Sequence, residues 1–208
     1  NVTVAIGTNP GSGTLAGTTT VASVAGVATF GTLSISVAGT GYTLTASSGT
    51  LTGATSGVFD VTPAAASQLS FTVQPTASWA GEAISPAVRV AAQDAYGNVA
   101  TSFTGNVTVA IGTNPGSGTL AGTTTVAAVA GVATFGALNI DKEGSGYTLT
   151  AGVTGLASAT SAAFDVAARI ATVSVTPGGA SLTGVGATQA FAAQARDALG
   201  NQLAGRTF

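Results

Sequence analysis

The sequence contains no histidine, no cysteine and no methionine. It therefore has no imidazole general base, no thiolate nucleophile, no disulfide and none of the usual ligands for zinc, copper or haem. These absences exclude most kinds of enzyme chemistry, and we predict that the chain is not an enzyme. They leave the redox compartment open, because a chain with nothing to oxidise suits any of them.

Charged residues are also scarce. They make up 6% of the chain, against about 25% in an average soluble protein. Five Lys and Arg residues against seven Asp and Glu residues give a net charge of −2. The chain thus lacks the basic surface that would neutralise nucleic-acid phosphates or anionic lipids, so we predict no nucleic-acid partner.

Long hydrophobic runs are missing as well. A helix that crosses a bilayer needs about 18–20 consecutive apolar residues. The nearest stretch, residues 126–138, is interrupted by glycine and threonine. We predict no membrane span in this segment. Because the sequence opens without Met or a signal peptide, we expect it to be a piece of a longer polypeptide.

An internal repeat is the most informative feature that is present. Residues 1–61 align without a gap with residues 106–166, with 15 differences, and the first 22 residues recur unchanged. A second similarity pairs VRVAAQDAYGN, ending at Asn98, with FAAQARDALGN, ending at Asn201. The offset is 105 residues between the two long copies and 103 between the two shorter segments. This is the length of an independent domain rather than of a solenoid repeat, so we predict an array of domains.

Within each copy, apolar and polar residues alternate, which is typical of half-buried strands. Leu69, Phe71 and Val73, for example, fall on one face of LSFTV. We predict seven strands for a complete unit, at residues 68–74, 86–94, 106–111, 122–129, 131–140, 146–152 and 160–167, and no helix. Seven short strands favour a two-sheet sandwich, so the predicted fold class is all-β, with tandem immunoglobulin-like β-sandwiches.

Glycine and tyrosine mark particular places in this pattern. The alternation of apolar residues changes phase in GVATFGALNI, which predicts a β-bulge at Gly136 and Ala137, and an equivalent one at Gly31 and Thr32 in the first copy. Tyr42 and Tyr147 stand at the start of the sixth strand. Immunoglobulin-like sandwiches carry a tyrosine corner there, with its hydroxyl bonded back to nearby backbone.

Several segments together resemble a known family. QLSFTVQPT, AGEAISPAVRVAAQDAYGN, GVATF and GYTLTA are similar to bacterial immunoglobulin-like repeats of large surface and secreted adhesins. Residues 168–201 resemble the start of the group-2 subtype found in intimin- and invasin-type proteins. The resemblance implies tandem sandwiches and an extracellular or cell-surface location in a bacterium. It implies little about activity, because such modules serve stalks, adhesive tips, enzyme accessory regions and phage fibres alike.

The repeat and the resemblance together predict three parts. Residues 1–62 are the C-terminal part of a domain that lacks its first two strands, residues 63–167 are a complete domain, and residues 168–208 are the first two strands of a further domain. Each incomplete part would expose an apolar face and an unpaired edge. We therefore predict that neighbouring domains of the same or an adjacent chain complete one another in a head-to-tail array.

Four aspartates are candidate calcium ligands. Asp94 and Asp197 begin Asp-x-x-Gly-Asn turns, whose oxygens suit calcium but would be used equally well by an Asx turn. Asp60 and Asp165 lie on the last strand of each unit, near the passage to the next domain, where they bind calcium or are simply solvated. Because calcium takes six to eight oxygen ligands, we predict no cofactor and keep calcium as the alternative.

Other side chains suggest binding or catalysis. Trp79 is the only tryptophan; it stacks on a sugar, docks a neighbouring domain or packs at the end of the sandwich. Asp141 and Glu143 are the only close pair of acids, whereas glycosidases need two carboxylates roughly 5–9.5 Å apart. Lys142 separates them and the first copy lacks both, so we interpret this segment as a solvated loop.

These observations predict a structural role. We expect a spacer, stalk or filament module of a bacterial surface or extracellular protein, because near-identical copies supply length. The alternative is an adhesin module that recognises carbohydrate or protein through loops at the end of the sandwich.

Overall fold

The computed structural model describes residues 1–205, and all of their regular elements are β-strands. The all-β prediction is therefore confirmed. Within the described residues there is no helix of the length and apolarity needed to cross a membrane. The strands are short, as expected where Gly accounts for 30 of 208 residues, because glycine weakens strand interiors and favours turns.

The first copy of the repeat forms eight strands. They are β1 (Val2–Ile6), β2 (Leu15–Ala16), β3 (Thr20–Val21), β4 (Ser34–Ile35), β5 (Gly39–Tyr42), β6 (Leu44–Ser47), β7 (Ala54–Thr55) and β8 (Phe59–Val61). Three strands precede the second copy: β9 (Gln68–Val73), β10 (Ser78–Trp79) and β11 (Val88–Gln93).

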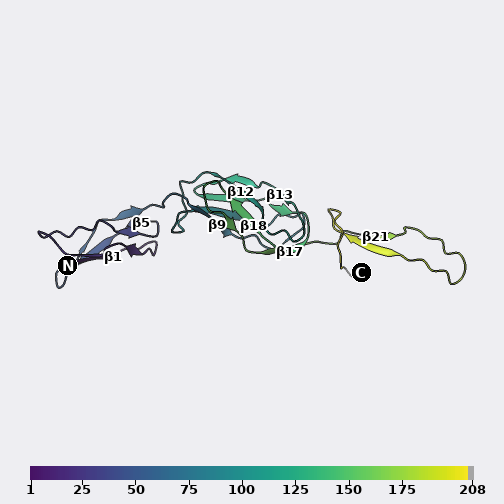
Figure 1. Cartoon of the computed structure of the whole chain (residues 1–208), viewed down its shortest axis with the longest axis horizontal. Helices are drawn as coiled ribbons and strands as arrows, with labels where there is room; N and C mark the ends of the chain where they lie inside the picture. Colours follow the sequence, from purple (N-terminus) through teal and green to yellow (C-terminus); the bar gives the residue numbers. More distant parts are fainter. Residues whose placement is uncertain (206–208) are drawn as a thin grey trace. The chain divides into compact units, whose positions relative to one another are not determined.

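The second copy forms nine strands. They are β12 (Asn106–Ile111), β13 (Leu120–Ala121), β14 (Thr125–Ala127), β15 (Val132–Phe135), β16 (Asn139–Ile140), β17 (Gly144–Tyr147), β18 (Leu149–Gly152), β19 (Ala159–Thr160) and β20 (Phe164–Ala167). A hairpin of β21 (Thr172–Thr176) and β22 (Ala192–Arg196) follows them; β21 is labelled in Figure 1.

Contacts divide the chain into two compact units. The first consists of residues 1–68, 91–104 and 129–132, and the second contains the other described residues. The predicted division at 1–62, 63–167 and 168–208 follows the repeat rather than these contacts, and it stays a prediction.

The two copies of the repeat form the same ladders. The first unit contains a sheet of order β3-β1-β6-β7, and the second contains the equivalent sheet, β14-β12-β18-β19. Val4 pairs with Ala46 in the first sheet, and Val109 pairs with Ala151 in the second. The cross-strand threonines also correspond, since Thr3 lies opposite Thr20 and Thr108 opposite Thr125.

Several strands predicted as continuous are divided because the chain passes from one sheet to another. The predicted strand at 131–140 becomes β15, which joins β11 and β9, and β16, which pairs with β13. The predicted bulge at Gly136 and Ala137 falls in the interruption between them. The predicted strand at 146–152 divides in the same way into β17 and β18. Such changes of sheet are the corners of packed β-structures.

The short strand β10 was not predicted. It pairs in parallel with β20, with Ser78 opposite Val166 and Trp79 opposite Ala167. Two residues are too few for an alternating pattern to be visible in the sequence. Together with β17 these strands form the sheet β10-β20-β17.

The side chains of the second copy form an apolar core. Alternating residues of β12, β15, β18 and β20 are buried, as the period of two requires. Those that are fully buried or nearly so include Val107, Val109, Ala133, Phe135, Leu149, Phe164 and Val166. Each large apolar side chain contributes about 1.5–3 kcal/mol when it is fully buried.

Candidate functional site

The two Asp-x-x-Gly-Asn turns hold the most deeply buried charged groups among the described residues. Asp94 is 1% exposed and Asp197 is 6% exposed. A buried carboxylate is costly unless hydrogen-bond donors surround it. The turns are therefore built around their aspartates.

The first turn shows why each residue type of the motif is needed. Oδ1 of Asp94 accepts hydrogen bonds from the N–H groups of Tyr96 and Asn98, both at 2.9 Å. The N–H of Asp94 donates to the carbonyl of Asn98 at 2.9 Å, which closes the turn. Gly97 has a φ of +86°, a left-handed conformation in which glycine has no steric penalty.

The second turn repeats this geometry. Oδ1 of Asp197 accepts from the N–H groups of Leu199 at 3.0 Å and of Asn201 at 2.8 Å. The N–H of Asp197 donates to the carbonyl of Asn201 at 3.0 Å. Gly200 takes a φ of +84°. The same five-residue pattern thus gives the same Asx turn twice.

The asparagine of each turn also reaches a distant segment of its own unit. Nδ2 of Asn98 donates to Oδ2 of Asp94 and to the carbonyl of Ser36, both at 3.0 Å. Oδ1 of Asn98 accepts the N–H of Ala38 at 2.9 Å. One side-chain amide therefore joins the turn to a segment about 60 residues earlier in the chain.

Asn201 makes the corresponding contact in the second unit. Its Nδ2 donates to Oδ2 of Asp197 at 2.9 Å and to the carbonyl of Asp141 at 2.7 Å. Asp141 is the equivalent of Ser36 in the repeat. We call residues 36–38 and 141–143 the docking segments, and we call the asparagine contact with them the clamp.

The docking segments are held from a second direction by the predicted tyrosines. The hydroxyl of Tyr42 donates to the carbonyl of Val37 at 2.9 Å, and that of Tyr147 donates to the carbonyl of Lys142 at 3.1 Å. Both rings are fully buried. A hydroxyl bonded to backbone five residues upstream is the geometry of a tyrosine corner.

The clamp explains why the docking segments differ so much between the copies. Ser-Val-Ala at 36–38 is replaced by Asp-Lys-Glu at 141–143. The groups that bind the asparagine and the tyrosine are backbone carbonyls and a backbone N–H. The contact therefore depends on the path of the backbone and tolerates the change of side chains.

The Asp94 carboxylate is stabilised in its charged form. Burial raises its pKa, but hydrogen bonds from the side chain of Asn98 and from the N–H groups of Ala64, Asn98 and Tyr96 outweigh this effect, so the pKa lies below its ordinary value. The net lowering of the pKa means that the folded turn prefers the ionised form.

The same donors bear on the calcium alternative. The carboxylate oxygens of Asp94 and Asp197 face N–H groups, which repel a cation. No group of three or more acidic residues that could hold a metal ion exists within residues 1–205. The hydrogen bonds that Asp94 and Asp197 form are those expected of an Asx turn.

Asp60 and Asp165 brace the strands of the tyrosine corners. Oδ1 of Asp165 accepts from the hydroxyl of Ser145 at 2.7 Å and from the N–H of Gly146 at 2.9 Å, and these bonds lower its pKa. Oδ1 of Asp60 accepts the N–H of Gly41 at 2.9 Å. Each aspartate thus links the last strand of its copy to the strand that carries the tyrosine.

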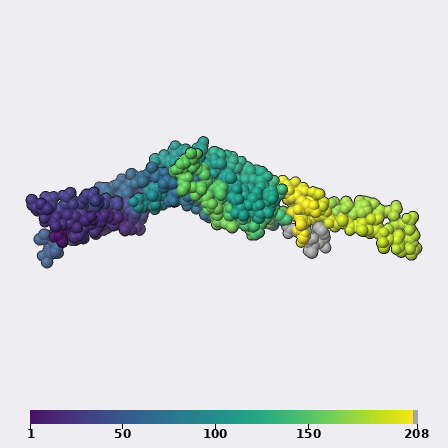
Figure 2. All heavy atoms as spheres, in the orientation of Figure 1, coloured from purple at the N-terminus to yellow at the C-terminus, as the bar shows by residue number. Residues whose placement is uncertain are grey.

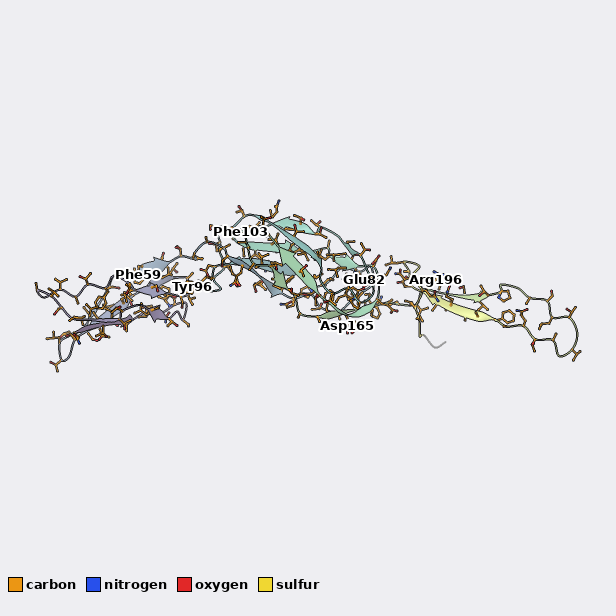
Figure 3. The ribbon with its side chains drawn as sticks, in the orientation of Figure 1. Phe59, Glu82, Tyr96, Phe103, Asp165 and Arg196 are labelled. Carbon is orange, nitrogen blue, oxygen red and sulfur yellow. The ribbon has the colours of Figure 1, made fainter. Side chains whose placement is uncertain are left out.

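Trp79 is partly covered by a residue that the sequence argument missed. The guanidinium of Arg169 lies 4.2 Å from the centroid of the Trp79 ring, a cation–π distance. Nη1 of Arg169 is 3.5 Å from Oε1 of Glu82, and both of these side chains are more than half exposed. Glu82 and Asp165 are labelled in Figure 3. The Trp79 ring remains 38% exposed.

Asp141, the first acid of the second docking segment, is bonded to backbone. Oδ1 of Asp141 accepts the N–H of Thr119 at 2.6 Å, so one acid is engaged with backbone. In the first copy the hydroxyl of Ser36 accepts the equivalent N–H, from Thr14, at 3.1 Å. The side chain at position 36 or 141 therefore binds the residue that precedes β2 or β13 in both copies.

Comparison with known proteins adds no relative. No protein-family model matches the chain, and no curated protein matches it.

Proposed function

We propose that this chain is a structural spacer, a stalk or filament module of a bacterial surface or extracellular protein, built from tandem immunoglobulin-like sandwiches. Its function is mechanical, and its length comes from the number of domains. The near-identity of the two copies supports this proposal, because a spacer needs the same unit again rather than a new surface.

The observation that carries the proposal is the clamp. By the predicted boundaries, Ser36 belongs to the part at 1–62 and Asn98 to the domain at 63–167. Asp141 belongs to the domain at 63–167 and Asn201 to the part at 168–208. With these boundaries each asparagine would tie one domain to the domain before it by the same bond to a backbone carbonyl, although by their contacts Ser36 and Asn98 lie in one compact unit, as do Asp141 and Asn201.

A repeated junction of this kind suits a spacer. A flexible linker makes the distance between two ends small and variable. A buried turn bonded to the preceding domain instead restrains the angle at each junction. The tyrosine that holds the docking segment from the other side connects the clamp to the core of that domain. Through the asparagine and tyrosine hydrogen bonds together, a pulling force on one domain would be passed to the core of the domain before it.

The tyrosine corners and the paired ladders also support the immunoglobulin-like part of the proposal. In that architecture the tyrosine precedes the last strands and its hydroxyl bonds upstream, as Tyr42 and Tyr147 do. The resistance of each domain to extension comes from the antiparallel ladders, which must break together when the ends are pulled along the strands.

Force spectroscopy tests the mechanical proposal. A polypeptide with several copies of residues 63–167 is stretched between a surface and a cantilever. We expect one unfolding event per copy, each releasing roughly 300 Å of chain, since about 105 residues extend by about 3.3–3.6 Å each and the folded length is subtracted. Smooth extension without separate events would contradict a load-bearing spacer.

The adhesin alternative has one observation in its favour. The indole of Trp79 keeps 38% of its surface exposed beside Arg169, and exposed tryptophans bind sugars by stacking. If the chain is an adhesin module, it should bind members of a glycan array, and Trp79→Ala should abolish that binding. The spacer proposal expects no binding in either protein.

A further inference from the structure

The asparagines of the chain fall into two groups by what their side-chain amides contact. Five of the seven form hydrogen bonds through the amide, with backbone or with the carboxylate of a turn: Asn9, Asn98, Asn114, Asn139 and Asn201. The amides of Asn1 and Asn106 form no hydrogen bond within residues 1–205, and both side chains are exposed. The fold therefore gives these two amides no structural role.

Both of these asparagines begin the same tripeptide. Asn1-Val2-Thr3 and Asn106-Val107-Thr108 have the form Asn-x-Thr, in which x is not proline. This tripeptide is the acceptor sequence for N-linked sugars, which are attached to the nitrogen of the asparagine side chain. None of the other five asparagines has serine or threonine two residues later. The two amides that the described residues leave unbonded are thus the two that belong to an acceptor tripeptide.

Strand β12 places the tripeptide of the second copy on the outer face of its sheet. Val107 and Val109 are buried, whereas Asn106 and Thr108 alternate with them and are exposed. Residues i and i+2 of a strand share a face, so the side chains of Asn106 and Thr108 are neighbours there. Figure 1 labels β12, and Figure 2 shows the heavy atoms of the second copy in teal and green. The folded strand presents the Asn106 amide to solvent and not to the core.

A hollow in this face has room for a sugar. It is lined by β12, β18 and the loop after β18, and its residues include Asn106, Thr108, Thr150, Gly152 and Thr154. Gly152 lies opposite Thr108 in the ladder. Apart from its chain neighbours, no atom lies within 4 Å of the position that a Cβ would take at Gly152. None of the lining residues is charged, so the hollow suits a neutral, hydroxyl-bearing group.

The composition gives such a group a physical role. Charged residues make up 6% of the chain and the net charge is −2. Proteins with a net charge near zero tend to associate, because little electrostatic repulsion keeps them apart. An N-linked sugar is bulky and solubilising. One sugar in each repeat would therefore keep neighbouring chains in solution without adding charge.

We propose that Asn106 is an N-glycosylation site whose first sugar is neutral, a hexose or an N-acetylhexosamine. Nδ2 of Asn106 forms a bond to the anomeric carbon of a sugar diphosphate, and the bond from that carbon to the diphosphate oxygen breaks. The diphosphate leaves with the bonding electrons, and one amide proton passes to a base of the transferring enzyme. The step needs no oxidant or reductant. This modification goes beyond the spacer proposal and does not depend on it.

Mass spectrometry of the protein isolated from its natural source tests the proposal. Trypsin cuts after Arg89 and Lys142, and the peptide between them, residues 90–142, contains one acceptor tripeptide. We expect this peptide to gain the mass of whole sugar residues, located on Asn106 by fragmentation. A single oligosaccharide of fixed size indicates a lipid-diphosphate donor, and a series that grows one sugar at a time indicates nucleoside-diphosphate donors; either result supports the site. An unmodified peptide, or sugars on serine and threonine alone, would overturn the proposal.

Two valine variants separate the acceptor tripeptide from the fold. The hydroxyls of Thr108 and Thr125 are 3.0 Å apart and form one hydrogen bond. Thr108→Val and Thr125→Val both remove this bond at exposed positions of the same face, but only Thr108→Val destroys the tripeptide. We expect the sugar on Asn106 to be lost in Thr108→Val and kept in Thr125→Val. Thr108→Ser, which preserves the acceptor sequence, should also keep the sugar.

These variants are produced in the natural source, so that the same transferring enzyme acts on each of them. Equal amounts of sugar on Asn106 in the two valine variants would overturn the proposal, because the threonine of the tripeptide would then have no part in the modification. Separate unfolding events in the force experiment would still support the spacer in that case.

Discussion

The side-chain amides of Asn98 and Asn201 each form hydrogen bonds with two segments of the chain, their own turn and a docking segment. The amide of Asn98 donates within its own turn and to Ser36, and it accepts from Ala38. A planar side-chain amide offers two N–H donors and a carbonyl acceptor, and the only other side chain with an amide, glutamine, is longer. The clamp is therefore sensitive to single substitutions.

We expect Asn98→Ala to lower the free energy of unfolding by about 1–3 kcal/mol, because it leaves buried polar groups of the turn without partners. Amide hydrogen exchange tests the clamp itself, because the N–H of Ala38 loses its acceptor in this variant. Exchange at Ala38 should become faster, while exchange at Gly7, bonded to the carbonyl of Thr43, should not change. Asn139→Ala, which removes only a 3.4 Å exposed bond, is the control.

The same turn predicts a dependence on acid. Burial raises the pKa of Asp94, but the hydrogen bonds from Asn98, Ala64 and Tyr96 lower it below the ordinary value of 3.8. A lowered folded-state pKa gives a stabilisation that is complete above the unfolded-state pKa and is lost as the pH falls through the folded-state pKa.

We therefore expect the free energy of unfolding in urea to decrease between about pH 4 and pH 2, and Asp94→Asn to show a smaller decrease. Asp165→Asn is the control, because the Asp165 carboxylate has a lowered pKa but is exposed to solvent, where screening weakens its contribution. Equal pH profiles for the unmodified chain and Asp94→Asn would contradict this account of the turn.

Part of this site was predictable from the sequence. The pattern Asp-x-x-Gly-Asn, present twice, identified both turns and the Asx bonding, with calcium as the alternative. The contacts of Asn98 and Asn201 with the docking segments were not predictable, because the acceptors are backbone carbonyls about 60 residues away and no residue type marks them. The same holds for Arg169 over Trp79, which only the pairing of β10 with β20 brings together.

At the scale of elements, the local sequence decides that a segment can be a strand, and its neighbours decide whether it is one. GVATFG forms β15 in the second copy and no strand in the first. The alternating pattern therefore predicted the positions of the strands well but not their divisions. Each division depends on which sheet the next residues join, and this information lies in distant parts of the chain.

Substitutions of Gly122 and Gly136 test the backbone structure around β13, β15 and β16. Gly122 has a φ of +97°, and a Cβ added there would collide with the carbonyl of Ala137. We expect Gly122→Ala to destabilise the chain by about 1–3 kcal/mol. Gly136, where the sequence predicted a bulge, has open space around the Cβ position and no positive φ, so Gly136→Ala should be neutral or slightly stabilising. Thermal unfolding of the two variants distinguishes these outcomes, and equal losses would contradict the structure of this corner.

At the scale of the whole molecule, the most prominent feature of the chain is its repetition. Two copies with 15 differences in 61 positions form the same ladders, the same tyrosine corners and the same clamps. Three of the differences fall in the docking segments, where the contacts with the asparagine and the tyrosine use backbone atoms. If the proposed array is correct, we expect that copies can be added or removed while the junction between neighbours is preserved.

The length of engineered arrays tests the central claim most directly. Polypeptides with two, four and eight copies of the 105-residue repeat are compared by the maximum dimension obtained from small-angle X-ray scattering. We predict that this dimension grows in proportion to copy number, by about 35–45 Å per copy, the length expected for sandwiches with strands of this size. A dimension that grows only as the cube root of copy number, as in a compact globule, would contradict the spacer.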